Sequence, residues 1–354
     1  MIVPERQAVS IHTRTGVPMF QYLPEKIGDG SWSRVTRDTS RCSLTLPPDD
    51  HLEKLEVVPW LHWASVWDID DAARPLWTGP IQSVTASRSS LKIEARDCSA
   101  FMSRTRVPMS KKWESTDVAL IAAEMWSAMI DLHGINAEPI VRLDPTGSMF
   151  DYTAVADTRL MSEAMDELVK MGLRWTVVSG VPILGPAPRD PIAALGDEHF
   201  QGDGLALTRD GSSAYNDVLL LAGDEKATAR VPMGGLNLQA IFTRDDVFGV
   251  SNAENAAYEG AKYYASIRDA VTLPGGSQLA PDAPLDIEQL IPSVRVNVEA
   301  YGQLYAMSLE QVDVPMGGSA NVSVSMQVVT DDLPELATVN GVQVGSGSSG
   351  GVTA

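Results

Sequence analysis

The chain has 354 residues, of which 44% are hydrophobic, and its formal net charge at pH 7 is −19. This length accommodates two or three domains with hydrophobic cores of their own. The negative charge argues against a protein that binds the phosphates of nucleic acid, because such binding needs clustered Lys and Arg. No apolar run reaches the length of a membrane span, and the amino-terminal residues lack the basic and apolar regions of a signal peptide. We therefore expect synthesis in a cytoplasm and no membrane insertion.

The acidity itself allows two interpretations. An acidic wall repels phosphate, so that DNA would slide past it without binding. A surplus of carboxylates also keeps an ordinary protein soluble, and charge alone leaves both interpretations open. The two cysteines, Cys42 and Cys98, form neither a metal-binding pattern nor a disulfide framework, and we expect both to be buried thiols.

Residues 1–106 are predicted to form an all-β unit, a small barrel or sandwich. Apolar and polar residues alternate in 9–12 and 41–46, and a Trp-rich run at 58–69 adds another strand. Gly28-Asp29-Gly30 predicts a turn between strands, because glycine favours turn conformations.

The stretch 76–101 is predicted to be a hairpin followed by a short helix that closes this unit. Its second strand, 91–97, alternates apolar with charged residues, which is typical of a half-buried strand. Asp97 or Ser99 is expected to cap the helix that holds Phe101. We expect Asp97 to be a cap or a buried hydrogen-bonding anchor, not a catalytic acid.

Residues 107–200 are predicted to form a small α+β module. A helix is expected over about 117–132, capped by Ser115 or Thr116 and stopped by Gly134, because its apolar residues follow three/four spacing. The module is completed by a second helix over about 159–171 and a hairpin of 173–178 and 181–185.

The pattern returns to strands after residue 200. A second β unit is predicted from 201–250 plus 285–332, because apolar and polar residues again alternate there. A helical insertion at 251–284 interrupts it, and Ser251 or Asn252 is expected to cap the helix.

Residues 333–354 lose all periodicity and end in a Gly/Ser-rich run, which predicts a flexible tail. With this tail set aside, strands outnumber helices along the chain. The predicted fold class is therefore α+β, mainly β.

The sequence holds few candidates for catalysis. None of the histidines lies in a zinc-binding helix motif, and the chain has neither a nucleophile elbow nor a phosphate-binding loop. We therefore expect no catalytic, cofactor-binding or metal-binding residues, and no cofactor. The histidines are expected to be packed or solvated side chains: His12, His51, His62, His133 and His199.

Two acidic clusters are the strongest remaining candidates. Asp68-Ile69-Asp70-Asp71 offers carboxylates to a hard cation, but it lacks the glycine and distal glutamate of a calcium loop, so a turn is the simpler explanation. Asp197-Glu198-His199 lies beside Gly196 in an expected interdomain loop, where a metal or catalytic role is the minor interpretation. Asp245-Asp246 and Asp331-Asp332 would place neighbouring carboxylates on opposite faces of a strand, which does not suit a glycosidase.

Trp60, Trp63 and Trp67 offer rings for stacking on a glycan, but burial in a core or a subunit interface is the favoured interpretation. The one notable basic patch follows the first β unit. We expect it to face a neighbouring subunit or domain, with a nucleic-acid role as the minor interpretation. It consists of Arg104, Arg106, Lys111 and Lys112.

Four short motifs occur in a definite order along the chain. An aromatic-x-Gly-x-Ile strand at Trp77-Thr78-Gly79-Pro80-Ile81 leads through the hairpin to Arg96-Asp97-Cys98-Ser99-Ala100-Phe101. The run 216–223 is strand-like, and Leu290-Ile291-Pro292-Ser293 leads into a late alternating strand. This ordered set, over about residues 1–332, resembles the siphophage minor tail proteins of the baseplate-hub family, which share the fold of the tail-associated lysin N-terminal domain. Ser293 stands where that family often has a glycine.

The resemblance implies a fold with two small related β-barrels. The first would be 1–106 and the second 201–250 plus 285–332, with the α+β module between them and the helical insertion in the second barrel. The implied function is that of a non-enzymatic structural hub protein of the virion, located at the tail tip. A homotrimeric ring would adapt the six-fold tail tube to the three-fold tip and form the channel for DNA ejection.

The resemblance also implies partners. They would be further copies of the chain, the distal tail protein, the tape measure protein and a tail fibre or spike. DNA would pass through the channel without specific binding.

Two other functions stay open at this point. A tail-associated cell-wall hydrolase, either a peptidase or a glycosidase, would need catalytic residues such as His199 or Asp197. In the resembling family such an activity usually belongs to an added carboxy-terminal domain. A host receptor-binding or glycan-binding tail module would use Trp63 and the neighbouring tryptophans.

Overall fold

The computed structural model has an α+β fold that is mainly β, which confirms the predicted fold class. It describes residues 6–47, 56–71, 73–145, 147–202, 205–212, 214–223, 225–243, 250–265, 268–272, 278–300, 302–317, 321–329, 337–339 and 342–344. The chain divides into two compact units. Unit 1 comprises Met1–Ala206 and Thr272–Gln327, and unit 2 comprises Leu207–Val271 and Val328–Ala354.

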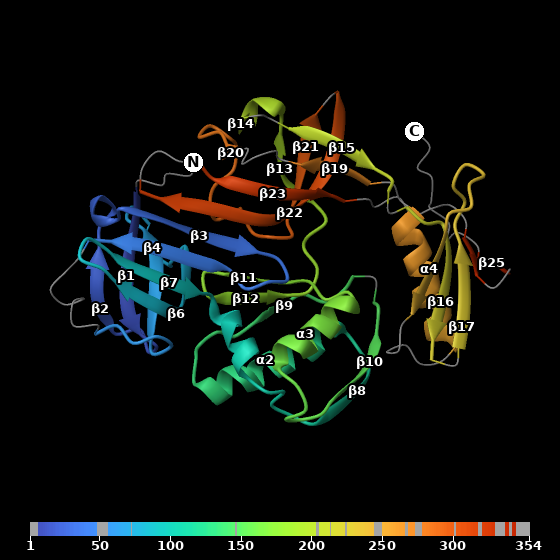
Figure 1. Cartoon of the computed structure of the whole chain (residues 1–354), viewed down its shortest axis with the longest axis horizontal. Helices are drawn as coiled ribbons and strands as arrows, with labels where there is room; N and C mark the ends of the chain where they lie inside the picture. Colours follow the sequence, from blue (N-terminus) through green and yellow to red (C-terminus); the bar gives the residue numbers. More distant parts are fainter. Residues whose placement is uncertain are drawn as a thin grey trace. The chain divides into compact units, whose positions relative to one another are not determined.

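Unit 1 is built on one large sheet (Figure 1). Its hydrogen-bonded neighbours follow the order β14-β20-β23-β22-β3-β4-β7-β6-β5-β1-β2, and β21 joins β22 to β13. The amino-terminal strands are β1 (Gln7–Thr13), β2 (Pro18–Tyr22), β3 (Asp29–Val35), β4 (Arg41–Leu46), β5 (His62–Asp68), β6 (Trp77–Ala86) and β7 (Leu91–Arg96). The later strands are β13 (Pro191–Leu195), β14 (Phe200–Gln201), β20 (Gln278–Leu279), β21 (Arg295–Ala300), β22 (Gln303–Met316) and β23 (Ser323–Val328).

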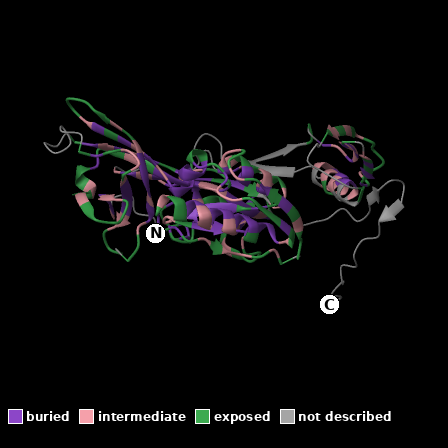
Figure 2. Cartoon of the chain, turned by 90° about the horizontal axis from the view of Figure 1, so that it is seen from below, coloured by how far each residue is buried: buried purple, intermediate pink, exposed green. Residues whose placement is uncertain are grey.

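The period-two patterns of the sequence produce these strands. In β4, Cys42, Leu44 and Leu46 are buried while the residues between them are not, as expected for a strand with one covered face. β7 alternates in the same way and pairs with both β4 and β6, so the predicted hairpin at 76–101 is confirmed. In Figure 2 the buried residues, drawn in purple, run through the strands and helices of unit 1.

The long strand β22 joins the early and late parts of the chain. It pairs with β3 over a register from Gln311↔Val35 to Met316↔Gly30, and with β21 on its other side. The early strands and β21 to β23 therefore belong to one sheet. Within the described residues this path runs from β14 to β2 without a pairing that closes it, so the two-barrel arrangement stays a prediction.

The predicted α+β module lies within unit 1, and its helices and strands pack in a large hydrophobic cluster that also includes Trp63 and Phe101 of the predicted first β unit. Its helices are α2 (Val118–His133) and α3 (Met161–Lys170), and its strands are β8 (Lys111–Thr116), β9 (Ile140–Val141), β10 (Phe150–Ala154), β11 (Trp175–Val178) and β12 (Val181–Leu184). Gly134 ends α2 in the left-handed conformation, as predicted. The predicted caps Ser115 and Thr116 are wrong, because Asp117 caps α2 by accepting a hydrogen bond from the N–H of Ala119 at 2.8 Å.

Unit 2 is a helix packed on a sheet (Figure 1). The helix is α4 (Val250–Ala265), and its small residues Ala253, Ala257 and Ala261 pack against the buried face of the sheet. The sheet has the order β18 (Gln239–Thr243), β16 (Asp217–Ala222), β17 (Glu225–Arg230), β24 (Ala337–Val339) and β25 (Val342–Val344). A separate pair is formed by β15 (Ala206–Asp210) and β19 (Arg268–Thr272).

The structure divides the predicted second β unit between the two units. Of the segment 201–250, β16 to β18 belong to unit 2, whereas β21 to β23 of the segment 285–332 belong to unit 1. Alternation predicts that a segment is a strand but not which sheet it joins. The predicted insertion at 251–284 is likewise divided, since its helix packs on β16 and β17 while β20 joins the sheet of unit 1.

Three local predictions also differ from the structure. Ser251 and Asn252 do not cap α4 but lie inside it, because the helix begins at Val250. Gly28-Asp29-Gly30 is not a turn throughout, because β3 begins at Asp29 and Gly30 pairs with Leu44. In the predicted tail 333–354, the described residues form the short strands β24 and β25. Of the helices in the described ranges, none combines the length and apolar composition that a membrane crossing requires.

Candidate functional site

Asp97 is the centre of a buried polar cluster at the end of the predicted hairpin. Its carboxylate is 2% exposed and accepts hydrogen bonds from the N–H groups of Ser99 at 2.8 Å and Ser40 at 2.7 Å, and from the Ser40 hydroxyl. The prediction of a cap and buried anchor is confirmed, because Asp97 caps the short helix η3 (Cys98–Arg104). Burial raises the pKa of Asp97, and the hydrogen bonds from Ser40 and Ser99 oppose that rise.

The aromatic-x-Gly motif completes this cluster, which we call the Asp97 anchor: Ser40, Trp77, Gly79, Asp97 and Ser99. The indole N–H of Trp77 donates to the hydroxyl oxygen of Ser40 at 3.2 Å. A Cβ atom on Gly79 would lie 1.9 Å from the carbonyl oxygen of Arg96, so only glycine fits there. The motif therefore has a packing role, which is to let β6 run against the end of β7.

Arg34 forms a second buried polar joint that the sequence did not reveal. Its side chain is 1% exposed and donates hydrogen bonds to the carbonyl oxygens of Ile287 at 2.7 Å, Leu290 at 3.0 Å and Leu76 at 2.9 Å. Burial lowers the pKa of Arg34 to about 10. Arg34 follows Trp32 by two residues, so in a strand over 29–35 both side chains lie on the same face. A charged residue on the same face as a large apolar one was the signal that could have revealed this site.

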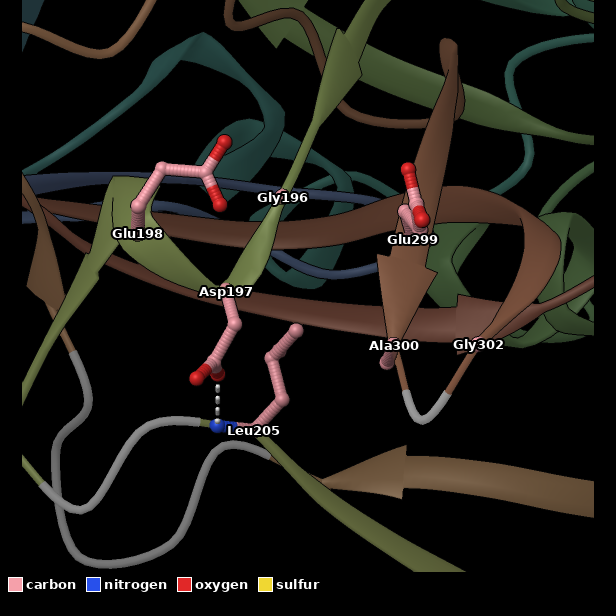
Figure 3. Close-up of a pocket in the computed structure, with 7 residues that line it drawn as sticks. All are labelled: Gly196, Asp197, Glu198, Leu205, Glu299, Ala300 and Gly302. Carbon is pink, nitrogen blue, oxygen red and sulfur yellow. Dashed lines mark hydrogen bonds between the residues drawn. The ribbon is translucent and has the colours of Figure 1, made fainter.

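The candidate binding site of unit 1 is an open pocket of about 430 Å³ (Figure 3). Its lining comes from the segment around the short helix η4 (Asp197–His199), from the end of β21 and from Gly302. Three carboxylates, of Asp197, Glu198 and Glu299, dominate it. We call it the acidic pocket, and its lining residues are Gly196, Asp197, Glu198, Leu205, Glu299, Ala300 and Gly302.

The predicted cluster Asp197-Glu198-His199 is thus partly assembled in this pocket. Asp197 is engaged in holding the loop, because its carboxylate accepts a hydrogen bond from the N–H of Leu205 at 3.3 Å. The Nδ1 atom of His199 accepts a hydrogen bond from the N–H of Gly196 at 2.9 Å. This nitrogen therefore carries no proton to share with Glu198, whose carboxylate lies 3.6 Å away.

The acidic pocket offers negative charge, supplied by its three carboxylates. No hydroxyl or thiol group is among its lining residues. Across the described ranges of the chain, no group of three or more His, Cys, Asp or Glu side chains is arranged to hold a metal ion. The pocket can therefore attract a cationic group.

The other acidic cluster, Asp68-Ile69-Asp70-Asp71, is a turn held by an arginine. Arg6 forms ion pairs with Asp68 at 3.0 Å and with Asp70 at 2.9 Å. Asp68 also accepts a hydrogen bond from the N–H of Asp70 at 2.9 Å, as in an Asx turn. This confirms the simpler explanation, a turn that closes the strand of Trp67. The pairs Asp245-Asp246 and Asp331-Asp332 lie outside the described residues.

The tryptophans do not form a common glycan platform. Trp63 is 8% exposed and stacks on Phe101 with a centroid distance of 6.3 Å. Trp60 contacts the same ring edge-on at 5.1 Å, and Trp67 donates its indole N–H to the hydroxyl oxygen of Ser10 at 2.7 Å. The favoured interpretation, burial in a core, is confirmed for Trp63, and the other two are partly buried.

The predicted basic patch is largely neutralised within the chain. Arg106 pairs with Asp157 at 3.1 Å, Lys111 with Glu124, and Lys112 with Glu114. Arg104 lies over the ring of Trp60, with 5.9 Å between the guanidinium carbon and the ring centroid. These contacts leave little net positive charge for a phosphate backbone, which supports the lesser weight given to nucleic-acid binding.

The cysteines and most histidines take the packed positions predicted for them. Cys42 and Cys98 are free and buried. His12 contacts the hydroxyl of Ser65 at 2.7 Å through Nε2, and His133 contacts that of Thr105 at 2.7 Å. His62 accepts a hydrogen bond from the N–H of Val58 at 2.8 Å, while His51 lies outside the described residues.

Comparison with solved structures identifies the class of fold. The chain is similar to a tail protein from Neisseria meningitidis MC58, with a TM-score of 0.65 and 14% identity over 93% of this chain and 98% of that one. It is similar to the 43 kDa tail protein of prophage MuSo2 from Shewanella oneidensis, with a TM-score of 0.63 and 14% identity over 91% and 98%. For prophage tail protein gp18 from Listeria monocytogenes EGD-e the TM-score is 0.59 and the identity 9%, over 92% and 95%.

The chain therefore has the fold of phage tail proteins over nearly its whole length. Because the sequence identities are at most 14%, these comparisons establish the fold alone. No family model and no curated protein sequence matches the chain.

Proposed function

We propose that this protein is a structural hub of a phage tail tip. The observation that carries the proposal is the shared fold with three phage tail proteins, which covers more than nine tenths of this chain and of each of theirs. In the proposed assembly the chain forms a homotrimeric ring at the distal end of the tail tube. The ring adapts the six-fold tube to the three-fold tip and surrounds the channel for DNA ejection.

The exposed sheet edges support an assembled state. Among the strands that the structure describes, β2 ends the path of unit 1 and β18 ends that of unit 2, so each presents backbone groups on one side. Strand edges of this kind invite pairing with other chains, and a closed symmetric ring satisfies them without uncontrolled association. The distal tail protein, the tape measure protein and a tail fibre or spike are the proposed further partners.

The charge distribution supports passage of DNA without specific binding. The net charge is −19, and the predicted basic patch is paired with carboxylates or stacked on a ring. A duplex would therefore meet repulsion rather than a phosphate-binding surface. The proposal includes no enzymatic role, because the proteins that share the fold are tail proteins.

The test is the mass of the full-length chain in solution, together with images of assembled tails. We expect three copies per ring, located at the tail tip of the virion, and binding to the purified distal tail protein. A chain that is a strict monomer both alone and on assembled tails would rule out the ring.

Enzymatic activity is tested separately. We expect purified wild-type protein to leave host cell wall intact. Hydrolysis that disappears on replacing Asp197 by Asn or His199 by Ala, in variants that still fold, would replace the structural proposal by a hydrolase.

A further inference from the structure

The sheet of unit 2 has two unlike faces. One face carries Val218, Leu220 and Ala222, which are buried under α4. The side chains between them point to the opposite face, where Leu219 and Leu221 remain partly exposed. This second face is thus apolar at its centre without being fully covered.

The register of the strands extends this apolar centre across the sheet. Leu219 pairs with Ile241 of β18, so both side chains stand on the same face. Ile241 is 67% exposed, which is unusual for a residue at the middle of a strand.

Two cations flank the apolar centre. Lys226 pairs with Leu221, and Arg230 pairs with Asp217, so both lie on this face of β17. Both are exposed, and within the described part of the chain neither forms an ion pair or a side-chain hydrogen bond. Asp217 stands on the same face and accepts a hydrogen bond from Gln239 at 3.3 Å, so the described residues of this face carry two cations against one carboxylate. We call this surface the basic face, comprising Leu219, Leu221, Lys226, Arg230 and Ile241.

Unit 1 carries a surface with the complementary composition. Glu299 of β21 pairs with Leu304 of β22, so the two side chains stand next to each other. Both are exposed, Leu304 by 65%, and Glu299 has no hydrogen bond or ion pair to any described residue. Glu299 also lines the acidic pocket, beside Asp197 and Glu198 (Figure 3). An exposed leucine and unbalanced carboxylates thus occur together.

We propose that the basic face of one copy of the chain docks on the acidic pocket and Leu304 of a second copy. Ile241 and Leu219 would meet Leu304, and Lys226 and Arg230 would meet the carboxylates. The inference rests on the proposed ring, and it names the surfaces that build it. Two different patches of one chain make a heterologous contact, which closes into a ring when the rotation between copies allows.

Charge is the reason for choosing a second copy as the occupant. A chain with net charge −19 repels its own copies over most orientations, so self-association needs a cationic patch placed against an acidic one. The basic face is such a patch, and its free cations contrast with Lys111 and Lys112, which are paired within the chain. Complementary charges at an interface also select the orientation of docking.

The experiment is a charge swap in the full-length protein, read by sedimentation equilibrium. Lys226→Glu and Glu299→Lys should each weaken self-association about tenfold or more, as expected for loss of a close charge pair plus a like-charge contact. The double variant restores opposite charges across the contact and should return to within a few-fold of the wild type. Lys112→Glu and Glu114→Lys make the same charge changes at exposed positions of the α+β module and should leave association unchanged.

The outcomes separate this inference from the proposed function. If the wild type forms a ring but neither single variant weakens it, or the double variant shows no rescue, the docking surfaces are wrong and the hub proposal stands. If the single variants lose binding to the distal tail protein while self-association is unchanged, the basic face serves another partner. A wild type that is monomeric alone and on tails would overturn both proposals.

Discussion

Asp97 and Asp197 occupy similar local positions in unit 1 but have opposite surroundings. Each follows a strand and stands at the start of a short 3-10 helix. Asp97 is 2% exposed, and three donors from Ser40 and Ser99 surround its carboxylate. Asp197 lines an open pocket with Glu198 and Glu299, and one backbone N–H donates to it.

The difference shows how burial decides the role of a carboxylate. A buried carboxylate must have its donors built in, so its contribution is to the stability of the fold. A solvated carboxylate keeps its charge available for a partner and adds little to stability. The Asp97 anchor and the acidic pocket should therefore respond differently to substitution.

The largest effect is expected from Gly79→Ala in the Asp97 anchor. The new methyl group would lie 1.9 Å from the backbone oxygen of Arg96, and backbone cannot yield as a flexible side chain can. We expect a loss of about 3 kcal/mol or more in the free energy of unfolding, measured by denaturant titration. Gly260→Ala in α4 is the control, because its Cβ would meet only Val218 at 4.0 Å and should stabilise the helix by about 0.5–1 kcal/mol. Equal effects of the two substitutions would refute the role given to Gly79.

Asp97→Ala should be the next most destabilising change. It removes the cap of η3 and leaves the N–H of Ser40 without its acceptor, so we expect a loss of about 2–4 kcal/mol in the free energy of unfolding. Thermal unfolding of the variant measures this loss. A variant that keeps its stability and its assembly but loses binding to the distal tail protein would show that Asp97 is functional rather than structural.

The pH dependence of stability gives a finer test of the same residue. Burial raises the pKa of Asp97 in the folded state, so the folded state holds this proton more tightly than the unfolded state does. Its contribution to stability is fully present below the ordinary pKa of about 3.9 and is lost as pH rises through the folded pKa. Asp97→Asn does not titrate. The free energy of unfolding of this variant should therefore rise relative to the wild type over that range, and a constant difference would contradict the prediction.

The smallest effect on stability is expected in the acidic pocket. Glu198→Gln and Glu299→Gln should each change the free energy of unfolding by less than about 0.5 kcal/mol, because both side chains are exposed. Thermal unfolding at low protein concentration separates this from any effect on association. A loss of stability as large as that of Asp97→Ala would mean that the carboxylates of the pocket stabilise the fold, as the carboxylate of Asp97 does.

The role of Asp97 as a cap and buried anchor could be predicted from the sequence because its signals are local, whereas its donor Ser40, 57 residues away, could not. The aromatic-x-Gly strand, the alternation of β7 and a capping residue before a short helix all lie within one stretch of the chain. The same reasoning singled out Asp197-Glu198-His199 but missed Glu299, which reaches the pocket from β21. It also missed Arg34, whose three acceptors lie far from it in the sequence.

The grouping of strands shows the same limit on a larger scale. The run 217–222 and the run 295–300 both alternate, yet the first packs under α4 in unit 2 and the second joins β22 in unit 1. Alternation predicts that one face of a strand will be covered, but it does not predict which element covers that face. The boundary between the units therefore could not be read from periodicity.

The sequence alone determined the hairpin at 76–101, the two helices of the α+β module, the glycine stop of the first helix and the buried role of Asp97, because these depend on spacing and on groups a few residues apart. Only the tertiary structure decided that β22 pairs with β3, that Arg34 is buried among carbonyl oxygens, and that Asp197, Glu198 and Glu299 share a pocket. Those outcomes depend on contacts between segments distant in the chain, whose free energy comes from burying the two surfaces together. The identity of a single residue does not determine which distant segment it will contact.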